Sequence, residues 1–407
     1  MMKKPASERA LNPFAASDGR RRVSFDDADL EEETLLHAPK ALSPSTSLYK
    51  PSNPTSRRQL PFIALGLVIG AVLGLAVGYV QFTRMDPGLS FAMKDGVQLT
   101  RQNPGDKLAR VSTDPFVLRV MTFNLRYGTA MDGLNSWPHR RAHVAELINR
   151  YHPVLLGTQE GMDEQLRQLH EMLVPQYERF GDPREDGGEH TQIFYDAHVV
   201  ERVQGGTFWL SETPQVPKSR GWDASHVRVA TWGRFRLRTT QQEFFYVNTH
   251  LDNTGKLAQL NGAKVIWTEM KKLVGNTLTP LFLTGDFNTL RPSDVYEYLT
   301  TNPEGPFFHD AWRVAEHPIG SISNSYHEWI GPAYDKTKHG DWLDAAMDQP
   351  DIPGANHIDF ILSRPQLPVT TTEVITESRN GRYPSDHYPI VAEFLFPSAT
   401  ELPPPST

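Results

Sequence analysis

Short apolar runs that end in polar residues recur from residue 117 to residue 394, and runs of this length predict buried strands. They cover residues 117–123, 154–157, 191–195, 207–210, 229–237, 244–249, 281–285, 357–362 and 388–394. Between them, apolar residues recur at helical spacing over residues 137–150, 162–173 and 256–273, and a short helix is expected from Ser293. Strands and helices that alternate in this way predict α/β layers rather than an all-β protein.

A different pattern occupies residues 60–82, where the chain is almost entirely apolar. From Pro61 to Phe82 there is no charged residue, and about 22 residues of helix are enough to cross a bilayer core of roughly 30 Å. We therefore predict one transmembrane helix. Glycine recurs at every fourth position, which would let two such helices pack as a homodimer, although the frequency of glycine in membrane helices explains the spacing equally well. The glycines are Gly66, Gly70, Gly74 and Gly78.

Composition divides the rest of the chain. Residues 1–59 are rich in serine, proline and charge without apolar periodicity, so we predict a disordered tail. Residues 83–115 contain turn-forming residues and are interpreted as a stalk, and the proline-rich residues 399–407 as a second disordered tail. A single folded domain over residues 116–398 is the simplest division of what remains.

The orientation of the predicted membrane helix depends on few charges. Basic residues near its two ends balance, so only the adjacent pair Arg57 and Arg58 favours one side. That pair favours a cytosolic N-terminus, with residues 116–398 on the lumenal or extracellular side of a single-pass membrane protein. Ser24 follows three arginines and would then be accessible to a cytosolic kinase, with an ordinary solvated arginine run as the alternative.

Composition also narrows the chemistry. The chain contains no cysteine, which excludes disulfides, thiolate metal sites and cysteine nucleophiles. After residue 94, Asp and Glu outnumber Lys and Arg by 39 to 29. A long nucleic acid normally needs a basic surface, so this acidic balance weighs against one without excluding a local basic patch.

Polar side chains gather at the ends of the predicted strands. After residues 281–285, a tight turn at Gly285 is followed by Asp286 and Asn288, whose side chains can point to the same side. Any one such residue could be an ordinary cap, but layered α/β proteins often place their sites at strand ends. Together the strand ends supply oxygen ligands suited to Mg²⁺, two imidazoles and a carboxylate that could deprotonate water. These residues are Asn124, Glu160, His250, Asp252, Asp286, Asn288, Asp359, Asp386 and His387.

The segments around these residues resemble the endonuclease/exonuclease/phosphatase superfamily of metal-dependent phosphodiesterases and phosphatases. The motifs MTFNLR, GTQE, NTHLD, TGDFN, HIDFIL and SDHYPI occur in the family's order and spacing. The flanking sequences NSWPHRR, IFYDAHVV, GTFWLSETP and VATWGRF are similar to a branch whose substrates are poorly defined. The resemblance covers about residues 116–396. It implies a four-layered α/β sandwich in which two packed β-sheets are flanked by helices.

For the metal, the resemblance implies Glu160 as the principal ligand of Mg²⁺, or of Mn²⁺ in its place. Asn124 and Asp386 would complete or buffer the surroundings of the metal. Because Mg²⁺ keeps several of its waters, one or two carboxylates suffice.

For catalysis, the resemblance implies that Asp286 accepts the proton of the attacking water and that Asn288 steadies this water or the developing phosphorane. His250 and His387 would hydrogen-bond the non-bridging oxygens, and Asp359 would orient His387 through its other ring nitrogen. Phosphoryl transfer needs charge neutralisation and in-line positioning but little covalent chemistry, which this set provides.

Substrate contacts are expected from the loops around the strand ends. Arg228 is the first candidate, for a second phosphate group, because it directly precedes the strand at 229–237. The long irregular segment 317–356 is of a kind that is usually functional or disordered. The further candidates are Glu189, Asp252 and His327.

The leading interpretation is a membrane-anchored, Mg²⁺-dependent phosphoester hydrolase in which water attacks phosphorus in line. A small or lipid-linked phosphoester is favoured over long nucleic acid because of the acidic charge and the predicted anchor. Two alternatives stay open, a nuclease acting on DNA or RNA and a non-catalytic binding module on the same scaffold. The sequence does not distinguish a monoester from a diester.

Overall fold

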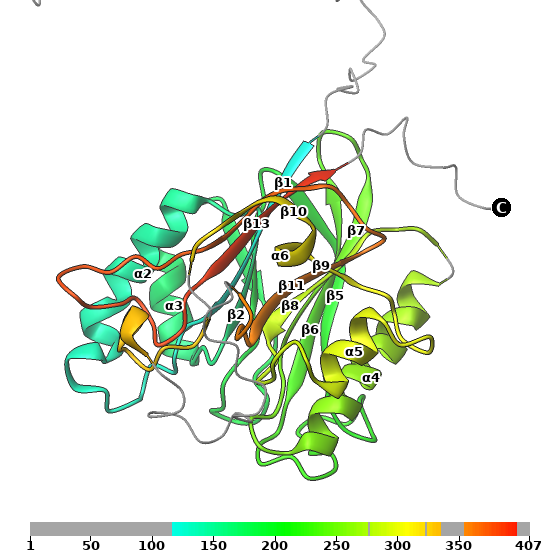
Figure 1. Ribbon diagram of the computed structural model, residues 1–407, viewed down its shortest axis with the longest axis horizontal. Coiled ribbons are helices and arrows are strands. Elements are labelled where there is room, and N and C mark those ends of the chain that lie inside the picture. The colour runs from blue at the N-terminus through cyan, green and yellow to red at the C-terminus, as the bar shows by residue number, and fades with distance from the viewer. Residues whose placement is uncertain (1–115, 276, 322–323, 335–353, 397–407) are drawn as a thin grey trace, which may run out of the picture. The chain divides into compact units, whose positions relative to one another are not determined.

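The computed structural model describes residues 116–396 except residues 276, 322–323 and 335–353. These residues belong to one compact unit of the chain. Their strands form two mixed sheets, one of seven strands and one of six, with helices on the outer faces (Figure 1).

The seven-stranded sheet contains both the first and the last described strand. Its strands are β1 (Phe116–Asn124), β2 (Leu155–Gln159), β3 (Tyr177–Phe180), β4 (Ile193–Asp196), β10 (Ala315–Ile319), β12 (Val369–Val374) and β13 (Ile390–Phe396). They lie in the order β10-β12-β13-β1-β2-β4-β3. Near its centre, β1 pairs in parallel with β2 and antiparallel with β13. Parallel pairing brings the polar C-terminal ends of β1 and β2 to the same edge.

The six-stranded sheet presents a second set of polar strand ends. Its strands are β5 (Val200–Trp209), β6 (Val229–Leu237), β7 (Glu243–His250), β8 (Leu281–Asp286), β9 (His309–Asp310) and β11 (Asp359–Arg364). They lie in the order β5-β6-β7-β8-β11-β9. Here β7 pairs in parallel with β8, and β8 pairs antiparallel with β11.

Aromatic side chains fill the space between the two sheets. Phe282 of β8 meets Phe394 of β13 edge to face with ring centroids 4.9 Å apart, and Phe244 of β7 meets Phe396 at 5.5 Å. All four rings are buried. Ring pairs of this kind stabilise a protein by about 0.5–1.5 kcal/mol each beyond their buried area.

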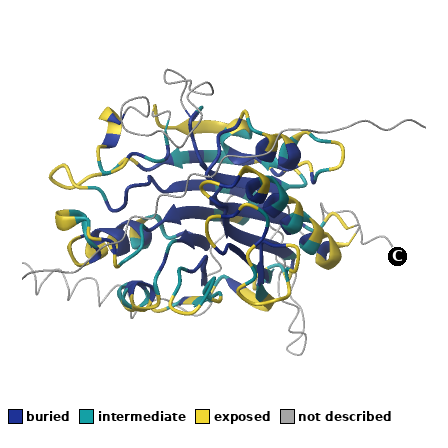
Figure 2. Cartoon of the chain, turned by 90° about the horizontal axis from the view of Figure 1, so that it is seen from below, coloured by how far each residue is buried: buried dark blue, intermediate teal, exposed yellow. Residues whose placement is uncertain are grey.

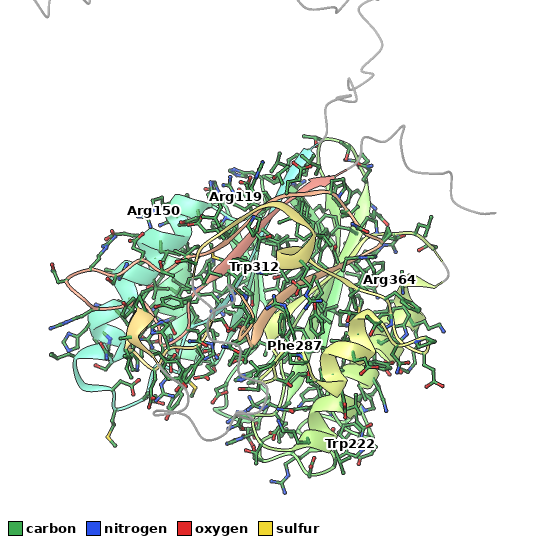
Figure 3. All side chains as sticks on the ribbon, in the orientation of Figure 1. Arg119, Arg150, Trp222, Phe287, Trp312 and Arg364 are labelled. Atoms are coloured by element: carbon green, nitrogen blue, oxygen red, sulfur yellow. The ribbon has the colours of Figure 1, made fainter. Side chains whose placement is uncertain are left out.

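Helices cover the outer face of each sheet. Buried side chains of α2 (Trp137–Tyr151) and α3 (Asp163–Met172) pack on the seven-stranded sheet, and those of α4 (Lys256–Val274) and α5 (Asp294–Thr300) pack on the other. In Figure 2 the strands are mostly buried, and exposed residues lie toward the outside. Phe287, labelled in Figure 3, belongs to the core beneath α4 and α5 and contacts Phe360 at 5.2 Å. The remaining short helices are η1 (Gly133–Asn135), α6 (Ala311–Val314) and η2 (Gly331–Ala333).

A buried polar contact joins the sheets directly below their strand ends. The Asn248 side-chain amide of β7 donates to the backbone oxygens of Thr158 at 2.8 Å and Gln192 at 3.1 Å, both from the other half of the fold. Its Oδ1 accepts a hydrogen bond of 2.7 Å from Gln159 of β2. Because an unpaired buried amide costs about 1–3 kcal/mol, these contacts favour one alignment of the sheets.

The α/β fold with two mixed sheets flanked by helices is confirmed. The strand predicted at 207–210 is only the end of β5, and β3, β9, β10 and β12 were not predicted. The segment 317–356, predicted to be irregular, begins inside β10. The predicted tails, stalk and membrane helix lie outside the described residues. Among the residues that the structure describes, no helix is long and apolar enough to cross a membrane.

Gly157 of β2 tests the contact between the sheets. A Cβ atom at this position would lie 2.4 Å from Asn248 Oδ1 and 2.7 Å from Thr284 Oγ1. We expect Gly157→Ala to reduce the free energy of unfolding by about 1–3 kcal/mol in urea denaturation, as overpacking does. Gly206→Ala in β5 is the control, since the nearest atom to its new Cβ is 3.5 Å away. Equal stability of the two variants would contradict the predicted contact.

Candidate active site

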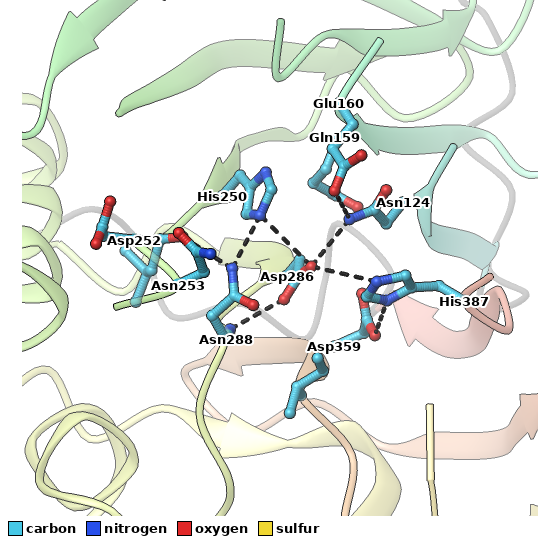
Figure 4. A network of polar contacts seen from close by, with 12 residues as sticks. Asn124, Gln159, Glu160, His250, Asp252, Asn253, Asp286, Asn288, Asp359 and His387 are labelled. Atoms are coloured by element: carbon cyan, nitrogen blue, oxygen red, sulfur yellow. Dashed lines mark hydrogen bonds and ion pairs between the residues drawn. The ribbon is translucent and has the colours of Figure 1, made fainter. Parts of the chain in front are cut away.

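Neighbouring strands of the six-stranded sheet bring titratable side chains into one row (Figure 4). His250 ends β7, Asp286 ends β8 and Asp359 begins β11. In the register of the sheet His250 lies beside Asp286, and Asp286 lies beside Asp359. All three side chains are buried. Strand pairing itself therefore positions this part of the site.

Asp286 lies at the centre of the row. Its Oδ2 accepts a hydrogen bond of 2.9 Å from Asn124 Nδ2, and its Oδ1 accepts one of 2.9 Å from the backbone N–H of Asn288. Burial and the neighbouring Asp359 carboxylate raise the pKa of Asp286 to about 7, although His387 opposes the rise. A carboxyl group with such a pKa can accept and release a proton near neutral pH.

His387 links the two aspartates. Its Nδ1 lies 3.0 Å from Asp359 Oδ2 and its Nε2 lies 3.7 Å from Asp286 Oδ2. Burial opposes protonation of His387, but the charges of Asp359 and Asp286 outweigh it and raise the pKa to about 10. At neutral pH the imidazole is therefore a cation that donates from Nδ1 to Asp359, and its Nε2–H faces the cavity side of Asp286.

His250 has the opposite charge state. Burial lowers the pKa of His250 well below its ordinary value, and the nearby cations Arg228 and His387 add to the effect. The neutral ring accepts at Nε2 a hydrogen bond of 2.9 Å from the side-chain amide of Asn288. Asn288 adopts a left-handed backbone with a φ of 49°, which asparagine tolerates better than most residues. The sharp turn after β8 thus places this amide beside His250.

Asn124 connects the ends of the two sheets. Its Nδ2 atom, at the end of β1, donates to Glu160 Oε1 at 3.1 Å as well as to Asp286 of the opposite sheet. Glu160 follows β2 with a φ of 61°, and its Oε2 accepts a hydrogen bond of 3.0 Å from the backbone N–H of Tyr127. One amide therefore holds a carboxylate from each sheet.

A buried arginine ties the segment after β1 to the segment that carries Asp386. Arg140 of α2 donates to the backbone oxygens of Leu125, of Arg126 at 2.7 Å and of Pro384 at 3.1 Å. Burial lowers the pKa of Arg140 to about 10, so it remains a cation at neutral pH. The side chain of Arg126 in turn lies 3.7 Å from Asp386 Oδ2.

Six of the nine predicted strand-end residues and a group of loop residues line one cavity of about 330 Å³, whereas Asn124, Asp252 and Asp359 do not line it. The six are Glu160, His250, Asp286, Asn288, Asp386 and His387. Among the predicted substrate contacts, Arg228 and Glu189 lie in its wall. A larger cavity of about 710 Å³ beside α5 contains none of the strand-end residues. We place the site in the smaller cavity because the buried titratable side chains converge there.

Two predicted substrate contacts do not line this cavity. Asp252 is 2% exposed and binds backbone N–H groups of its own and a neighbouring loop. His327 is fully buried, with its ring 4.6 Å from that of Tyr383 and 4.0 Å from that of Tyr388, and burial lowers its pKa to about 3. Both residues therefore have partners within the protein, and their contact with substrate stays a prediction.

Sequence reasoning missed several residues of the cavity wall. Arg126 and Asn253 stand beside predicted residues in the MTFNLR and NTHLD motifs, so their positions gave a usable signal. Arg184 lies in the turn between β3 and β4, and nothing in its local sequence marks it. The missed wall residues are Arg126, Tyr127, Arg184, His226, Asn253 and Tyr326.

Two groups of ligand atoms are candidates for a divalent cation. Within the described part of the chain, Asp286, Asp359 and His387 form a candidate metal site, since each offers one ligand atom and these atoms lie within 4.8 Å of one another. In this group the imidazole of His387 already contacts both carboxylates, with Nδ1 3.0 Å from Asp359 and Nε2 3.7 Å from Asp286. The other group is the predicted one, Glu160 with Asn124 and Asp386.

The fold and the site define a two-sheet α/β hydrolase with a candidate metal centre at the strand ends. The chain belongs to the endonuclease/exonuclease/phosphatase family, whose sequence model matches residues 121–387. This span includes all the catalytic and metal-binding residues predicted above. Comparison with curated proteins finds no match.

Solved structures from Bacteroides species share the fold. An endonuclease/exonuclease/phosphatase protein of Bacteroides vulgatus is 32% identical with a TM-score of 0.60, and the match covers 69% of this chain and 98% of that one. A family protein of Bacteroides thetaiotaomicron is 30% identical with a TM-score of 0.59, covering 70% and 97%. A mannosyl-6-phosphatase of the same species is 30% identical with a TM-score of 0.58, covering 69% and 100%.

The contacts of Asp252 predict a pH-dependent contribution to stability. Although burial opposes it, hydrogen bonds from several backbone N–H groups lower the pKa of Asp252 to about 2. These donors belong to Gly255, Ser225, His226 and Thr254. A depressed folded-state pKa stabilises the protein above the unfolded value of about 3.9, and this stabilisation is lost as the pH falls toward 2.

We therefore expect Asp252→Asn to lower the free energy of unfolding at pH 7 by roughly 1–3 kcal/mol, the range for hydrogen bonds to a charged group. The difference from wild type should shrink below pH 4, because the carboxylate of the unfolded chain is then protonated while the folded one, with a pKa of about 2, is still charged. Urea denaturation between pH 7 and pH 3 measures it. A difference that stays constant over this range would contradict the depressed pKa.

Proposed function

We propose that this chain is a divalent-metal-dependent phosphatase that hydrolyses a small phosphorylated substrate. The observation that carries the proposal is the environment of Asp286. This buried carboxyl group has a pKa of about 7 and lies between the Asn124 amide and the cationic His387. Such a group can take a proton from water while a neighbouring cation and amide bind the oxygens of a phosphoryl group.

The chemistry of the residues around Glu160 fits a hard cation. Glu160 is a partly exposed carboxylate in the cavity wall that the Asn124 amide positions by donating to it, and the carboxylate of Asp386 lines the same cavity. Burial raises the pKa of Asp386, and Glu160 adds to the rise although His387 opposes it, as expected where negative charge lacks full compensation. Oxygen ligands of this kind suit Mg²⁺ or Mn²⁺. A cation held there would neutralise charge on the phosphoryl oxygens.

The described side chains then divide the remaining work. Asp286 accepts the proton of the attacking water. Its position is fixed by Asn124 and by the backbone N–H of Asn288. His387 donates a hydrogen bond from Nε2 to a phosphoryl oxygen, because Asp359 holds its Nδ1. His250 is neutral, so it contributes a dipole rather than a charge.

A small phosphomonoester is the substrate class we propose. A cavity of about 330 Å³ is at the lower end of the range for small-molecule sites. The mannosyl-6-phosphatase of Bacteroides thetaiotaomicron, 30% identical over nearly its full length, supports a sugar phosphate in particular. These observations favour a small substrate over DNA, RNA or a long lipid. Attachment of the enzyme to a membrane by residues 60–82 remains part of the proposal.

Removal of metal tests the first half of this proposal. Hydrolysis of a panel of phosphomonoesters by the full chain should stop in EDTA and return with Mg²⁺. Glu160→Gln should lower kcat/KM by roughly 10²-fold or more, the scale of a lost electrostatic contact in an active site. The exposed Glu171 of α3 provides a matched control as Glu171→Gln. Full activity in EDTA would exclude the metal-dependent mechanism.

Substitution of Asp286 tests the second half. Asp286→Asn nearly preserves volume but removes the proton acceptor, so kcat should fall by about 10²–10⁴-fold while substrate binding changes little. Asp359→Asn should reduce kcat less, because its role is to orient and charge His387. The surface variant Asp186→Asn is the control, since Asp186 is exposed and pairs only with Lys218 among the described residues. Near wild-type turnover of a folded Asp286→Asn protein would show that Asp286 is not the base.

A further inference from the structure

A cluster of three side chains in the cavity wall takes no part in the proposed chemistry. Arg184, Glu189 and Arg228 line both the main cavity and a small hollow that also borders His250. Arg184 Nη1 donates to Glu189 Oε2 at 3.0 Å, and Arg228 Nη2 donates to Asn253 Oδ1 at 3.2 Å. We call these three residues the polar cluster.

The polar cluster contains unused hydrogen-bond donors. The Nε atoms of Arg184 and Arg228 are buried and have no hydrogen-bond partner among the described residues. Their nearest carboxylates, on Glu185 at 3.4 Å and Asp252 at 3.6 Å, form ion pairs without a hydrogen bond from these atoms. These two atoms lie within the wall, so a ligand in the cavity would instead meet the outer N–H groups of the two guanidinium groups that line it.

The charges of the polar cluster balance once the neighbouring Asp252 is included. Arg184 is ion-paired with Glu189, and Arg228 is 6% exposed with Asp252 nearby. Burial raises the pKa of Glu189 and lowers that of Arg228, so the surroundings disfavour charge of either sign. A second phosphate group would meet the Glu189 carboxylate and be repelled by it. An uncharged ligand is therefore favoured over a second anion.

A hydroxyl group matches this combination, because it donates to a carboxylate and accepts from a guanidinium at the same time. We infer that the polar cluster binds neighbouring hydroxyl groups on the carbon skeleton of the substrate. It would thus select sugar or polyol phosphates over aryl, alkyl and doubly phosphorylated esters. The inference rests on the proposed function, since the phosphate end of the substrate is taken to lie at the strand ends.

The turn from Arg184 to Glu189 is closed by its own backbone hydrogen bonds. The N–H of Arg184 donates to the oxygen of Glu189 at 2.9 Å, and the N–H of Gly188 donates to the oxygen of Glu185 at 2.9 Å. Gly187 has a φ of 67°, which suits glycine. These bonds hold Arg184 and Glu189 together, and two other segments support the turn through a hydrogen bond of 2.8 Å from Trp209 Nε1 to the oxygen of Arg184 and the ion pair of Lys218 with Asp186.

Kinetics on two substrates test the inference. The full chain is assayed with Mg²⁺ on mannose 6-phosphate and on phenyl phosphate, which lacks the hydroxyl groups. We define the ratio as kcat/KM for mannose 6-phosphate divided by kcat/KM for phenyl phosphate. Glu189→Gln should lower this ratio by roughly tenfold or more, because the substrate hydroxyl groups lose a hydrogen-bond partner. Asp186→Asn is the control from the same turn and should leave the ratio within about twofold, because Asp186 is exposed and does not line the cavity.

Binding measurements separate this inference from the proposed function. Calorimetry with mannose 6-phosphate should show a roughly tenfold higher Kd for Glu189→Gln than for wild type, whether or not turnover occurs. An unchanged ratio together with an unchanged Kd would overturn the polar cluster as a hydroxyl site. Tighter binding of mannose 1,6-bisphosphate than of mannose 6-phosphate would overturn it in favour of a second phosphate site. Failure of the wild type to hydrolyse either ester would contradict the proposed function, and the calorimetry would still decide the inference.

Discussion

The site exists only while the two β-sheets keep one alignment, because each sheet supplies part of it. Asn248 binds backbone oxygens across the interface, and Asn124 of one sheet donates to Asp286 of the other. Both contacts are short and directional, unlike the aromatic packing around them. A slide of one sheet along the other by one residue, about 3.3 Å, would separate these partners. Burial of apolar side chains holds the two sheets together, and the side-chain amides of Asn248 and Asn124 determine how the sheets are aligned.

With the sheets aligned in this way, the site holds two carboxylates, those of Asp286 and Asp359, close together. Strand pairing sets Asp286 beside Asp359, and their repulsion adds to the effect of burial. His387 relieves the repulsion by becoming a cation between them. A buried ion pair of this kind contributes little to stability, since desolvation offsets the attraction. The pair instead matters for protonation. Asp286 can accept a proton, His387 is charged, and His250 is neutral.

The sequence is informative wherever a side chain's surroundings come from its own strand. The pattern of residues 281–288 predicted both β8 and the position of Asp286 at its end, because a strand that is buried on both faces has an almost continuous run of apolar residues. β5 was only partly predicted, since its first half is exposed and bulged near Arg202. Asp252 shares a motif with His250, but its carboxylate oxygens accept hydrogen bonds from backbone N–H groups of Ser225 and His226, which lie in another loop. These contacts could not be predicted from the motif. Arg184 was missed for the same reason, as only the fold brings its turn to the cavity.

The self-closed turn from Arg184 to Glu189 has a consequence for how such proteins can diverge. It joins β3 and β4 at one edge of its sheet, whereas Asp286 is positioned by the neighbouring strands of the other sheet. Its residues can therefore be exchanged without altering the strands that carry the base. Selection for a new substrate could act on this one turn and leave the reaction unchanged. In this sense the turn is an exchangeable segment that carries two of the three residues of the polar cluster.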